Sequence, residues 1–329
     1  MTEPHPLPKG NGKPPGTTSW NRSITSAGNE MRSYYGRPVL KEPVWQREIP
    51  WYLFTGGLGG GSAVLSIVAR VAGNERLARR SIYIGAASDA VSPLLLISDL
   101  GRPERFLNML RVFKVTSPMS VGSWILAVSS AASSLSAFLN AIRRLRRISD
   151  GARAVAAGSG APLAVYTATL ISDTAIPVWH EARRELPFLF GSSALASAGA
   201  AAAIAVPPGE AGPARRLAIG GAVVENAVMV RMERRLGMIG EPYKQGESGK
   251  YAKLAKACTL GGAGLLAAAG RRNRAAAVGG GALVLAGEVA LRWSVFKAGF
   301  QSARDPKYTV VPQRERAQQR GTAATSKVS

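Results

Sequence analysis

Apolar stretches of roughly 18–22 residues recur along the chain, and they constrain its fold more than any other feature. Stretches of this length span a lipid bilayer as helices. Residues 187–206 carry no charge at all, which is difficult to reconcile with the surface of a soluble protein. We therefore predict an all-α integral membrane protein with eight transmembrane helices, arranged as two four-helix bundles. The predicted spans are 52–71, 82–99, 121–141, 162–180, 187–206, 214–230, 252–270 and 275–296.

Small residues dominate several of these spans. The first contains five glycines between Gly56 and Gly61, and the last contains Gly279-Gly280-Gly281. Glycine weakens a soluble helix, whereas in a bilayer small side chains let neighbouring helices approach closely and pack by van der Waals contact. The alternative, a soluble alanine-rich helical protein, is disfavoured by the uncharged fifth span.

Polar segments flank the membrane region on both sides. Residues 1–46 are rich in Pro, Gly, Ser and Asn without apolar periodicity, and the chain ends in a polar segment that is rich in arginine. These segments lower the mean hydropathy of the whole chain to +0.04. Such compositions favour disorder or loose attachment. We predict a loosely attached tail over 1–46, a membrane domain over 47–298 and a flexible C-terminal tail over 299–329.

The chain is strongly basic, with 42 Lys and Arg against 20 Asp and Glu. The arginines are dispersed near the ends of the spans, which is typical of residues that anchor loops at lipid headgroups. No aromatic-interleaved basic surface accompanies them. We therefore predict membrane lipid, and not nucleic acid, as the partner of these charges.

Residue counts disfavour haem and metal cofactors. The only histidines are His5 and His180, whereas two bis-histidine haems need four. The single cysteine, Cys258, lies in an apolar span and cannot alone hold an iron–sulphur cluster or build a zinc site. We predict no haem and no metal in this chain, so a redox role would consist of binding a mobile carrier.

Eight spans place both termini on one side of the membrane, which we name the N-side. The predicted N-side loops are 100–120, 181–186 and 231–251, and those of the opposite side are 72–81, 142–161, 207–213 and 271–274. Basic residues are more numerous on the N-side. The positive-inside rule therefore favours cytoplasmic termini, in a protein of the cell membrane.

Four carboxylates fall within the predicted spans, namely Asp89, Asp173, Glu225 and Glu288. Ionisable groups are costly in a bilayer and by default indicate a proton path or a polar ligand site. We predict that these four transfer protons. The alternative for each is a structural pair with an arginine or a backbone group, and for Glu288 that arginine is Arg292, one helical turn away.

Tyr166, Asp173 and His180 are spaced by seven residues in the predicted fourth span. This spacing places them on one helix face that crosses the bilayer. Such a row is suitable for relaying protons, and equally suitable for hydrogen-bonding quinone carbonyls at one end.

Two polar turns on the N-side are the most specific motifs of the sequence. Asp99-Leu100-Gly101-Arg102-Pro103-Glu104-Arg105-Phe106 follows the second span, and Ser117-Pro118-Met119-Ser120 with Gly122-Ser123-Trp124 opens the third. With Trp51-Tyr52-Leu53-Phe54-Thr55 before the glycines, and Tyr166 followed by Pro177-Val178-Trp179, these motifs resemble the NrfD or polysulphide-reductase membrane-subunit family. The resemblance covers residues 45–300.

The resemblance implies a haem-free, eight-helix membrane subunit of a respiratory complex, as in anaerobic respiration. Such subunits exchange electrons between quinone, either menaquinone or ubiquinone, and a ferredoxin-like 4Fe–4S subunit attached to a molybdopterin-type catalytic subunit. It implies no catalytic residue in this chain and a quinone pocket near the N-side. The residues expected at that pocket are Glu48, Trp51, Tyr52, Asp99, Arg102, Tyr166 and His180.

Two other classes of function stay open. A proton-coupled transporter or channel also needs buried carboxylates and interrupted helices, for which Pro93 and Pro177 are candidate breaks. A purely structural anchor for a peripheral enzyme needs no carboxylate within the membrane. Replacing Asp173 or Glu225 by the matching amide separates these classes, because only an anchor would lose nothing.

Overall fold

A computed structural model describes residues 39–100, 102 and 104–325, so the predicted tail over 1–46 lies mostly outside the described residues. The described chain is helical and contains no strand. Its α-helices are α2 (Glu48–Val71), α3 (Glu75–Asp99), α4 (Arg105–Arg111), α5 (Pro118–Ala141), α6 (Arg146–Ser172), α7 (Pro177–Glu181), α8 (Leu186–Ala205), α9 (Gly212–Leu236), α10 (Gly246–Ala268), α11 (Arg274–Arg304) and α12 (Lys307–Thr325).

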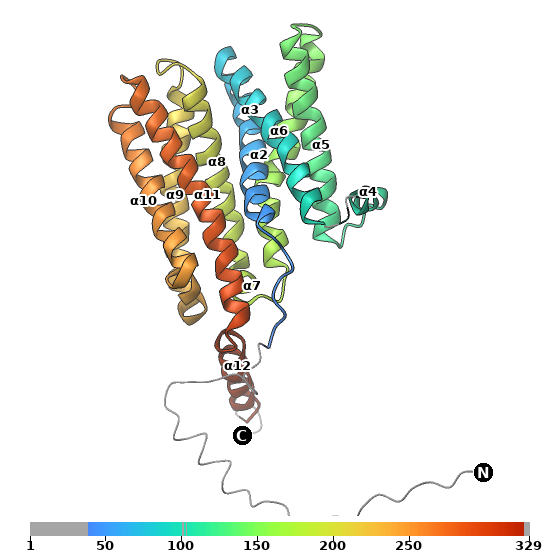
Figure 1. Ribbon diagram of the computed structural model, residues 1–329, viewed down its shortest axis with the longest axis vertical. Helices are drawn as coiled ribbons and strands as arrows, with labels where there is room; N and C mark the ends of the chain where they lie inside the picture. Colours follow the sequence, from blue (N-terminus) through green and yellow to red (C-terminus); the bar gives the residue numbers. More distant parts are fainter. Residues whose placement is uncertain (1–38, 101, 103, 326–329) are drawn as a thin grey trace, which may run out of the picture.

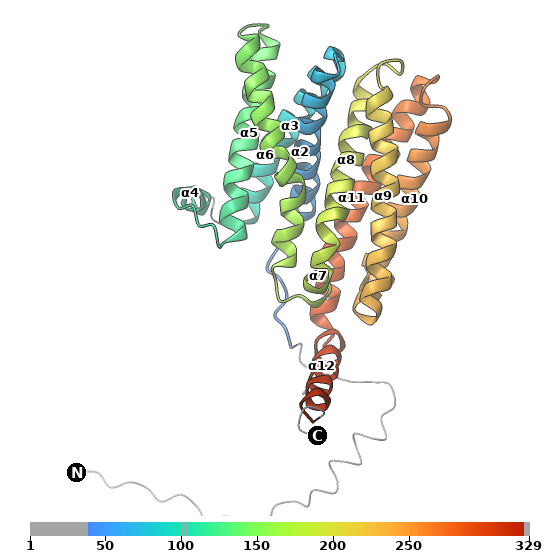
Figure 2. The same ribbon diagram turned by 180° about the vertical axis from the view of Figure 1, so that it is seen from behind.

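The eight longest of these helices run side by side and alternate in direction along the chain (Figures 1 and 2). The start of α2 and the end of α11 lie at the same end of the molecule, together with α4, α7 and α12. This end is the N-side. The opposite side consists of four short connections, at 72–74, 142–145, 206–211 and 269–273.

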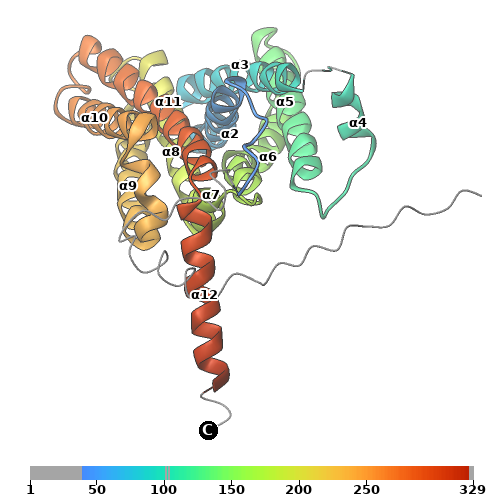
Figure 3. The ribbon, with the colours of Figure 1, turned by 60° about the horizontal axis from the view of Figure 1, so that its bottom comes forward.

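The helices pack in two groups. In one, α2, α3, α5 and α6 contact one another, and in the other α8 and α9 pack together, as do α10 and α11. The groups meet mainly where α2 packs on α8 and α6 packs on α8. Seen from the N-side, α12 projects away from both groups (Figure 3).

Glycines bring α2 into backbone contact with its neighbours. A side chain on Gly60 would overlap the backbone of Gly160 in α6, and one on Gly61 would lie 2.6 Å from the carbonyl oxygen of Ala194 in α8. Only glycine permits such close approach. The glycine-rich sequence of the first span therefore determines how tightly α2 is held between the two groups.

Six helices are long and apolar enough to cross a membrane, namely α2, α3, α5, α6, α8 and α11. Several apolar helices of this kind make the chain a multi-pass membrane protein, as predicted. The predicted spans 214–230 and 252–270 fall on α9 and α10, which are long enough but are not among the six apolar candidates of the described chain.

The predicted fourth span, 162–180, is wrong in both limits. Helix α6 covers Arg146–Ser172, and residues 173–176 then leave the helix before Pro177 begins the short α7. Charged residues at the start of α6 indicated a loop over 142–161, but Asp150 pairs with Arg70 of α2 through contacts of 3.0 and 3.1 Å. This pairing lets charged residues belong to the helix.

The predicted boundary at residue 298 is also displaced. Helix α11 continues to Arg304, and Lys307–Thr325 form α12 within the segment expected to be a flexible tail. Two ion pairs connect α12 to the N-side, from Lys307 to Glu241 and from Arg316 to Glu181, each at 2.5 Å. Runs of Gln, Arg and Ala favour helix whenever such contacts hold them.

Candidate functional site

Two tyrosines are buried together near the N-side ends of their helices. Tyr52 in α2 is 1% exposed and Tyr166 in α6 is 8% exposed, and they belong to the same core cluster. Neither hydroxyl forms a hydrogen bond with another described residue. Neither hydroxyl oxygen is among the fully buried unpaired atoms of the described residues, so a partner from outside the protein could reach both.

The start of α5 determines where Tyr166 lies. Ser117 caps this helix by accepting a hydrogen bond from the Ser120 backbone N–H, and Pro118 occupies its first turn. One turn later the tyrosine ring lies against Gly122, where a methyl group would overlap it. The Ser-Pro-Met-Ser sequence therefore begins the helix, and the glycine that follows leaves room for the Tyr166 ring against the α5 backbone.

Aromatic residues close the N-side of this region. Trp179 of α7 is fully buried, donates its Nε1–H to the Val295 carbonyl at 2.8 Å, and stacks on Trp45 at 5.5 Å between ring centroids. Its ring lies against Gly299 of α11, where a Cβ atom would overlap it. These contacts fix α7 and the chain before α2 on the end of α11.

The other residues expected at the quinone pocket separate into two sets. Asp99 accepts the Gln46 backbone N–H at 2.9 Å, and its carboxylate lies near that of Glu48, one oxygen of which is buried without a partner. In contrast, Trp51, Arg102 and His180 are exposed. The structure brings together Tyr52 with Tyr166 and Glu48 with Asp99, but not all seven residues.

Asp89 lies fully buried in the middle of α3. One carboxylate oxygen accepts hydrogen bonds from Ser129 and Ser133 of α5, each at 2.9 Å. The other oxygen lies against Gly59 of α2 and has no partner. Asp89 is thus held by neutral donors rather than by a cation.

A second buried acidic group joins three helices of the other half. Glu288 of α11 accepts a hydrogen bond from Ser193 of α8, and its carboxyl lies within hydrogen-bond reach of Glu225 of α9. Both glutamates are 2% exposed or less. Two buried carboxyl groups in contact are unfavourable unless they share a proton.

Arg292 does not form the structural pair considered for Glu288. Among the described residues no ion pair joins the two side chains; instead the guanidinium lies 3.7 Å from the centroid of the Phe190 ring and donates to the Phe190 carbonyl at 3.3 Å. Its Nε and Nη1 atoms are buried without hydrogen bonds. Arg292 therefore stabilises negative charge on the Glu225–Glu288 pair by electrostatic attraction at a distance, without a direct ion pair.

The predicted row of Tyr166, Asp173 and His180 does not exist. Helix α6 ends at Ser172, so Asp173 is an exposed residue at its C-terminus and His180 is an exposed residue of α7. The longer α6 also moves Tyr166 to the N-side half of the membrane, beside Tyr52. The structure thus places Tyr166 near Tyr52 and not in a row with Asp173 and His180.

Sequence reasoning missed the neutral partners of the buried acids. Ser129, Ser133 and Ser193 look like small packing residues in apolar helices, and nothing in their spacing identifies the carboxylate that each one meets. The dispersed arginines predict contacts with lipid headgroups, but their sequence positions do not predict that seven of them line one cavity. Within the described residues, no cluster of His, Cys, Asp or Glu is arranged to hold a metal ion.

The bundle of long, apolar helices defines a multi-pass membrane protein, and it encloses several carboxyl groups. A family model, Polysulphide reductase, NrfD, matches residues 38–208, which is more than half of the chain. The chain therefore belongs to the NrfD family, whose members are membrane subunits of respiratory oxidoreductase complexes. NrfD proteins in general partner with iron–sulphur and molybdopterin subunits. No curated protein matches the chain.

Proposed function

We propose that this protein is the quinone-reactive membrane subunit of its complex, with all eight long helices crossing the membrane as two four-helix bundles. Quinone or quinol, of the menaquinone or ubiquinone type, enters from the lipid on the N-side and meets Tyr52 and Tyr166. The observation that carries this proposal is that two neighbouring, largely buried tyrosines form no hydrogen bond through their hydroxyls with another described residue, while neither hydroxyl oxygen is fully enclosed by the protein.

The residues around the tyrosines fit a flat, apolar ring with two oxygen atoms. Phenolic hydroxyls donate to quinone carbonyls, and they accept from quinol hydroxyls. Ile49, Leu126 and Ile171 of the same cluster supply apolar walls. Quinone supplies two-electron chemistry when bound, and the chain's own residues orient its oxygens and exclude water around them.

Electron exchange needs a partner close to this end of the membrane. We infer that a ferredoxin-like 4Fe–4S subunit docks on the N-side and connects to a molybdopterin-type catalytic subunit. Exposed arginines support this docking, since Arg102, Arg183 and Arg184 present positive charge on the N-side, where Trp51 is also exposed. Opposite charge on the partner would set the orientation of docking more than its strength.

Proton movement balances the electrons. Reduction of one quinone to quinol takes up two electrons and two protons, and the reverse reaction releases both. Asp89 and the Glu225–Glu288 pair are the buried carboxyl groups of the described chain that can hold a proton within the membrane. Asp173 is exposed and has no part in this proposal.

The first test is to tag the full chain, extract it in mild detergent and identify what co-purifies. Iron–sulphur and molybdopterin subunits together with extractable quinone support the proposal. A second measurement compares quinol-linked turnover of Tyr52→Phe and Tyr166→Phe with that of Tyr83→Phe, a half-buried tyrosine of α3 outside the cluster. Loss of turnover only in the first two would assign the site.

The alternative is a proton-coupled transporter or channel. The break before Pro177 agrees with this class, whereas Pro93 lies inside an uninterrupted α3. A chain that purifies alone and free of quinone would favour the transporter. Retained subunits with no effect of either tyrosine substitution would instead indicate a structural anchor.

A further inference from the structure

A cavity of the described chain lies on the opposite side, away from the tyrosines. It has a volume of about 860 Å³ and is bounded by the C-terminal ends of α2 and α5 and the N-terminal ends of α3 and α6. Seven arginines and three carboxylates line it, which leaves an excess of four positive charges. A cavity of this charge attracts an anion.

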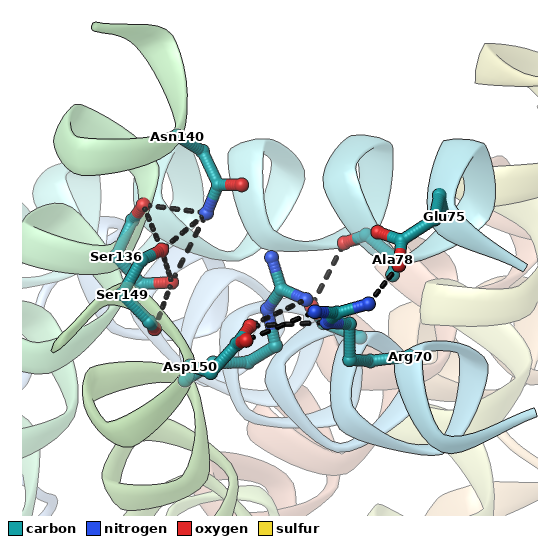
Figure 4. A network of polar contacts seen from close by, with 9 residues as sticks. Arg70, Glu75, Ala78, Ser136, Asn140, Ser149 and Asp150 are labelled. Carbon is teal, nitrogen blue, oxygen red and sulfur yellow. Dashed lines mark hydrogen bonds and ion pairs between the residues drawn. The ribbon is translucent and has the colours of Figure 1, made fainter. Parts of the chain in front are cut away.

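The three carboxylates of the cavity are already engaged. Asp150 accepts two hydrogen bonds from Arg70, at 3.1 and 3.0 Å, while Glu75 also contacts Arg70 (Figure 4). Glu210 pairs with Arg76 at 2.5 Å. Four further arginines of the lining form no ion pair with a carboxylate of the described chain, namely Arg79, Arg143, Arg144 and Arg146.

Arg153 is the least expected residue of this lining. Its side chain is only 2% exposed, and its nearest acidic atom, Oδ1 of Asp150, lies 3.6 Å away, too far for a hydrogen bond. Its Nε and Nη1 atoms are buried without a hydrogen bond, and the long ion pair with Asp150 is the contact of Nη1 with a charged group. A buried guanidinium with unused donors is costly, and an anion in the cavity would satisfy it.

The turn between α5 and α6 forms part of the wall of the cavity. The turn from α5 to α6 places Arg143 and Leu145 in the left-handed region, with φ of 55° and 51°, and α6 then begins without a side-chain cap. Behind the turn, Asn140 donates to the Ser149 hydroxyl at 2.6 Å and to the Ser136 carbonyl at 2.8 Å (Figure 4). These hydrogen bonds hold the end of α5 against the start of α6, next to the arginines that line the cavity.

We propose that this cavity binds a phosphate-bearing anion, and that its source is the headgroup of an acidic phospholipid. Guanidinium groups match phosphate oxygens in pairs. The uncapped N-terminus of α6 adds backbone donors and a favourable dipole. A headgroup source follows from position, because the cavity lies at the ends of membrane helices, where headgroups are concentrated. The proposal goes beyond quinone chemistry and does not depend on it.

The test uses the full chain in dodecyl maltoside, washed free of lipid. Phosphatidylglycerol, phosphatidylcholine with the same acyl chains, and inorganic phosphate are titrated separately, with bound lipid counted by native mass spectrometry and the unfolding temperature recorded. The double variant Arg143→Gln/Arg144→Gln alters the exposed rim, and Arg153→Gln alters the buried donor. The matched control is Arg271→Gln/Arg272→Gln, an exposed pair on the same side.

We expect phosphatidylglycerol to bind more tightly than phosphatidylcholine, and the rim variant to weaken it by roughly tenfold or more. The control should change binding by less than about twofold. A phosphate-dependent rise in unfolding temperature that the rim variant abolishes, without lipid selectivity, would support the anion site and assign a soluble source. Equal binding to the rim variant and the control, or no binding of either anion, would overturn the proposal, even if Arg153→Gln fails to fold.

Discussion

The aromatic ring of Tyr166 lies directly on the backbone of Gly122, so α6 and α5 meet through a tyrosine and a glycine. This contact connects the short motif at the start of α5 to a residue that is expected to bind quinone. It also explains why the motif contains glycine at that position, since any side chain would displace the ring.

Replacing Gly122 by alanine should therefore move Tyr166 and lower stability. Overpacking of this kind costs about 1–3 kcal/mol, and we expect a lower unfolding temperature together with reduced quinol-linked turnover. Gly158→Ala in the same helix as the tyrosine is the control, because a methyl group there meets open space. An unfolding temperature that falls equally in both variants would contradict this explanation.

The Glu225–Glu288 pair should be required for turnover but not for assembly. Glu288→Gln keeps a hydrogen-bond acceptor for Ser193 and removes one exchangeable proton site. We expect quinol-linked turnover to fall by about tenfold or more, within the range for loss of a proton-transferring group, while the subunits still co-purify. Glu247→Gln, an exposed carboxylate paired with Lys297, should leave turnover unchanged.

Asp89 should contribute to stability through its two serine donors. Asp89→Ala leaves the hydroxyls of Ser129 and Ser133 without their acceptor, at a cost of about 1–3 kcal/mol for each buried group. Asp89→Asn retains an acceptor oxygen and should unfold at a temperature closer to that of the natural protein. The triple variant that also carries Ser129→Ala and Ser133→Ala should recover part of the loss. If it does not, the serines are not the cause.

The segment before α2 is attached to the end of α11 by a surface ion pair that responds to acid. Arg304 donates to Glu42 at 2.8 and 3.0 Å, and this hydrogen bonding holds the pKa of Glu42 below its ordinary value of 4.5. Because the pKa of Glu42 is lower in the folded state, the contribution is fully present above pH 4.5 and is lost as the pH falls through the folded pKa. Selective carboxyl labelling should report a Glu42 pKa nearer 4.5 in Arg304→Gln, with little change in unfolding temperature at neutral pH.

The sequence predicted the helical membrane class and the family, because apolar length and compact motifs are local properties. It misplaced α6 for a physical reason: Asp150 and Arg153 look like loop residues until Arg70 of a distant helix neutralises the carboxylate. Hydropathy counts such charges as exposed. Pairing between helices is a tertiary property that a single helix does not contain.

The sequence predicts which types of residue form the candidate site, but it does not predict which of these residues contact one another. Buried carboxylates were recognisable as costly in lipid, but the meeting of Glu225 with Glu288 depends on how α9 and α11 pack. Likewise, the placement of Tyr166 beside Tyr52 followed only once the true limits of α6 were known. When the predicted limits of a membrane helix are wrong, its residues are assigned to the wrong depth in the membrane, as happened for Tyr166.

The glycines of α2 give the two groups of helices a shared wall. Gly60 meets Gly160 of the first group, and Gly57 and Gly61 meet Ala194 of the second. The two groups of helices are in direct contact through α2. A bulky substitution at Gly59 would disturb Asp89, and one at Gly57 would disturb Arg292. The protein is in this respect a single mechanical unit, and cutting the chain between α7 and α8 would yield fragments that must recombine around one glycine-lined seam.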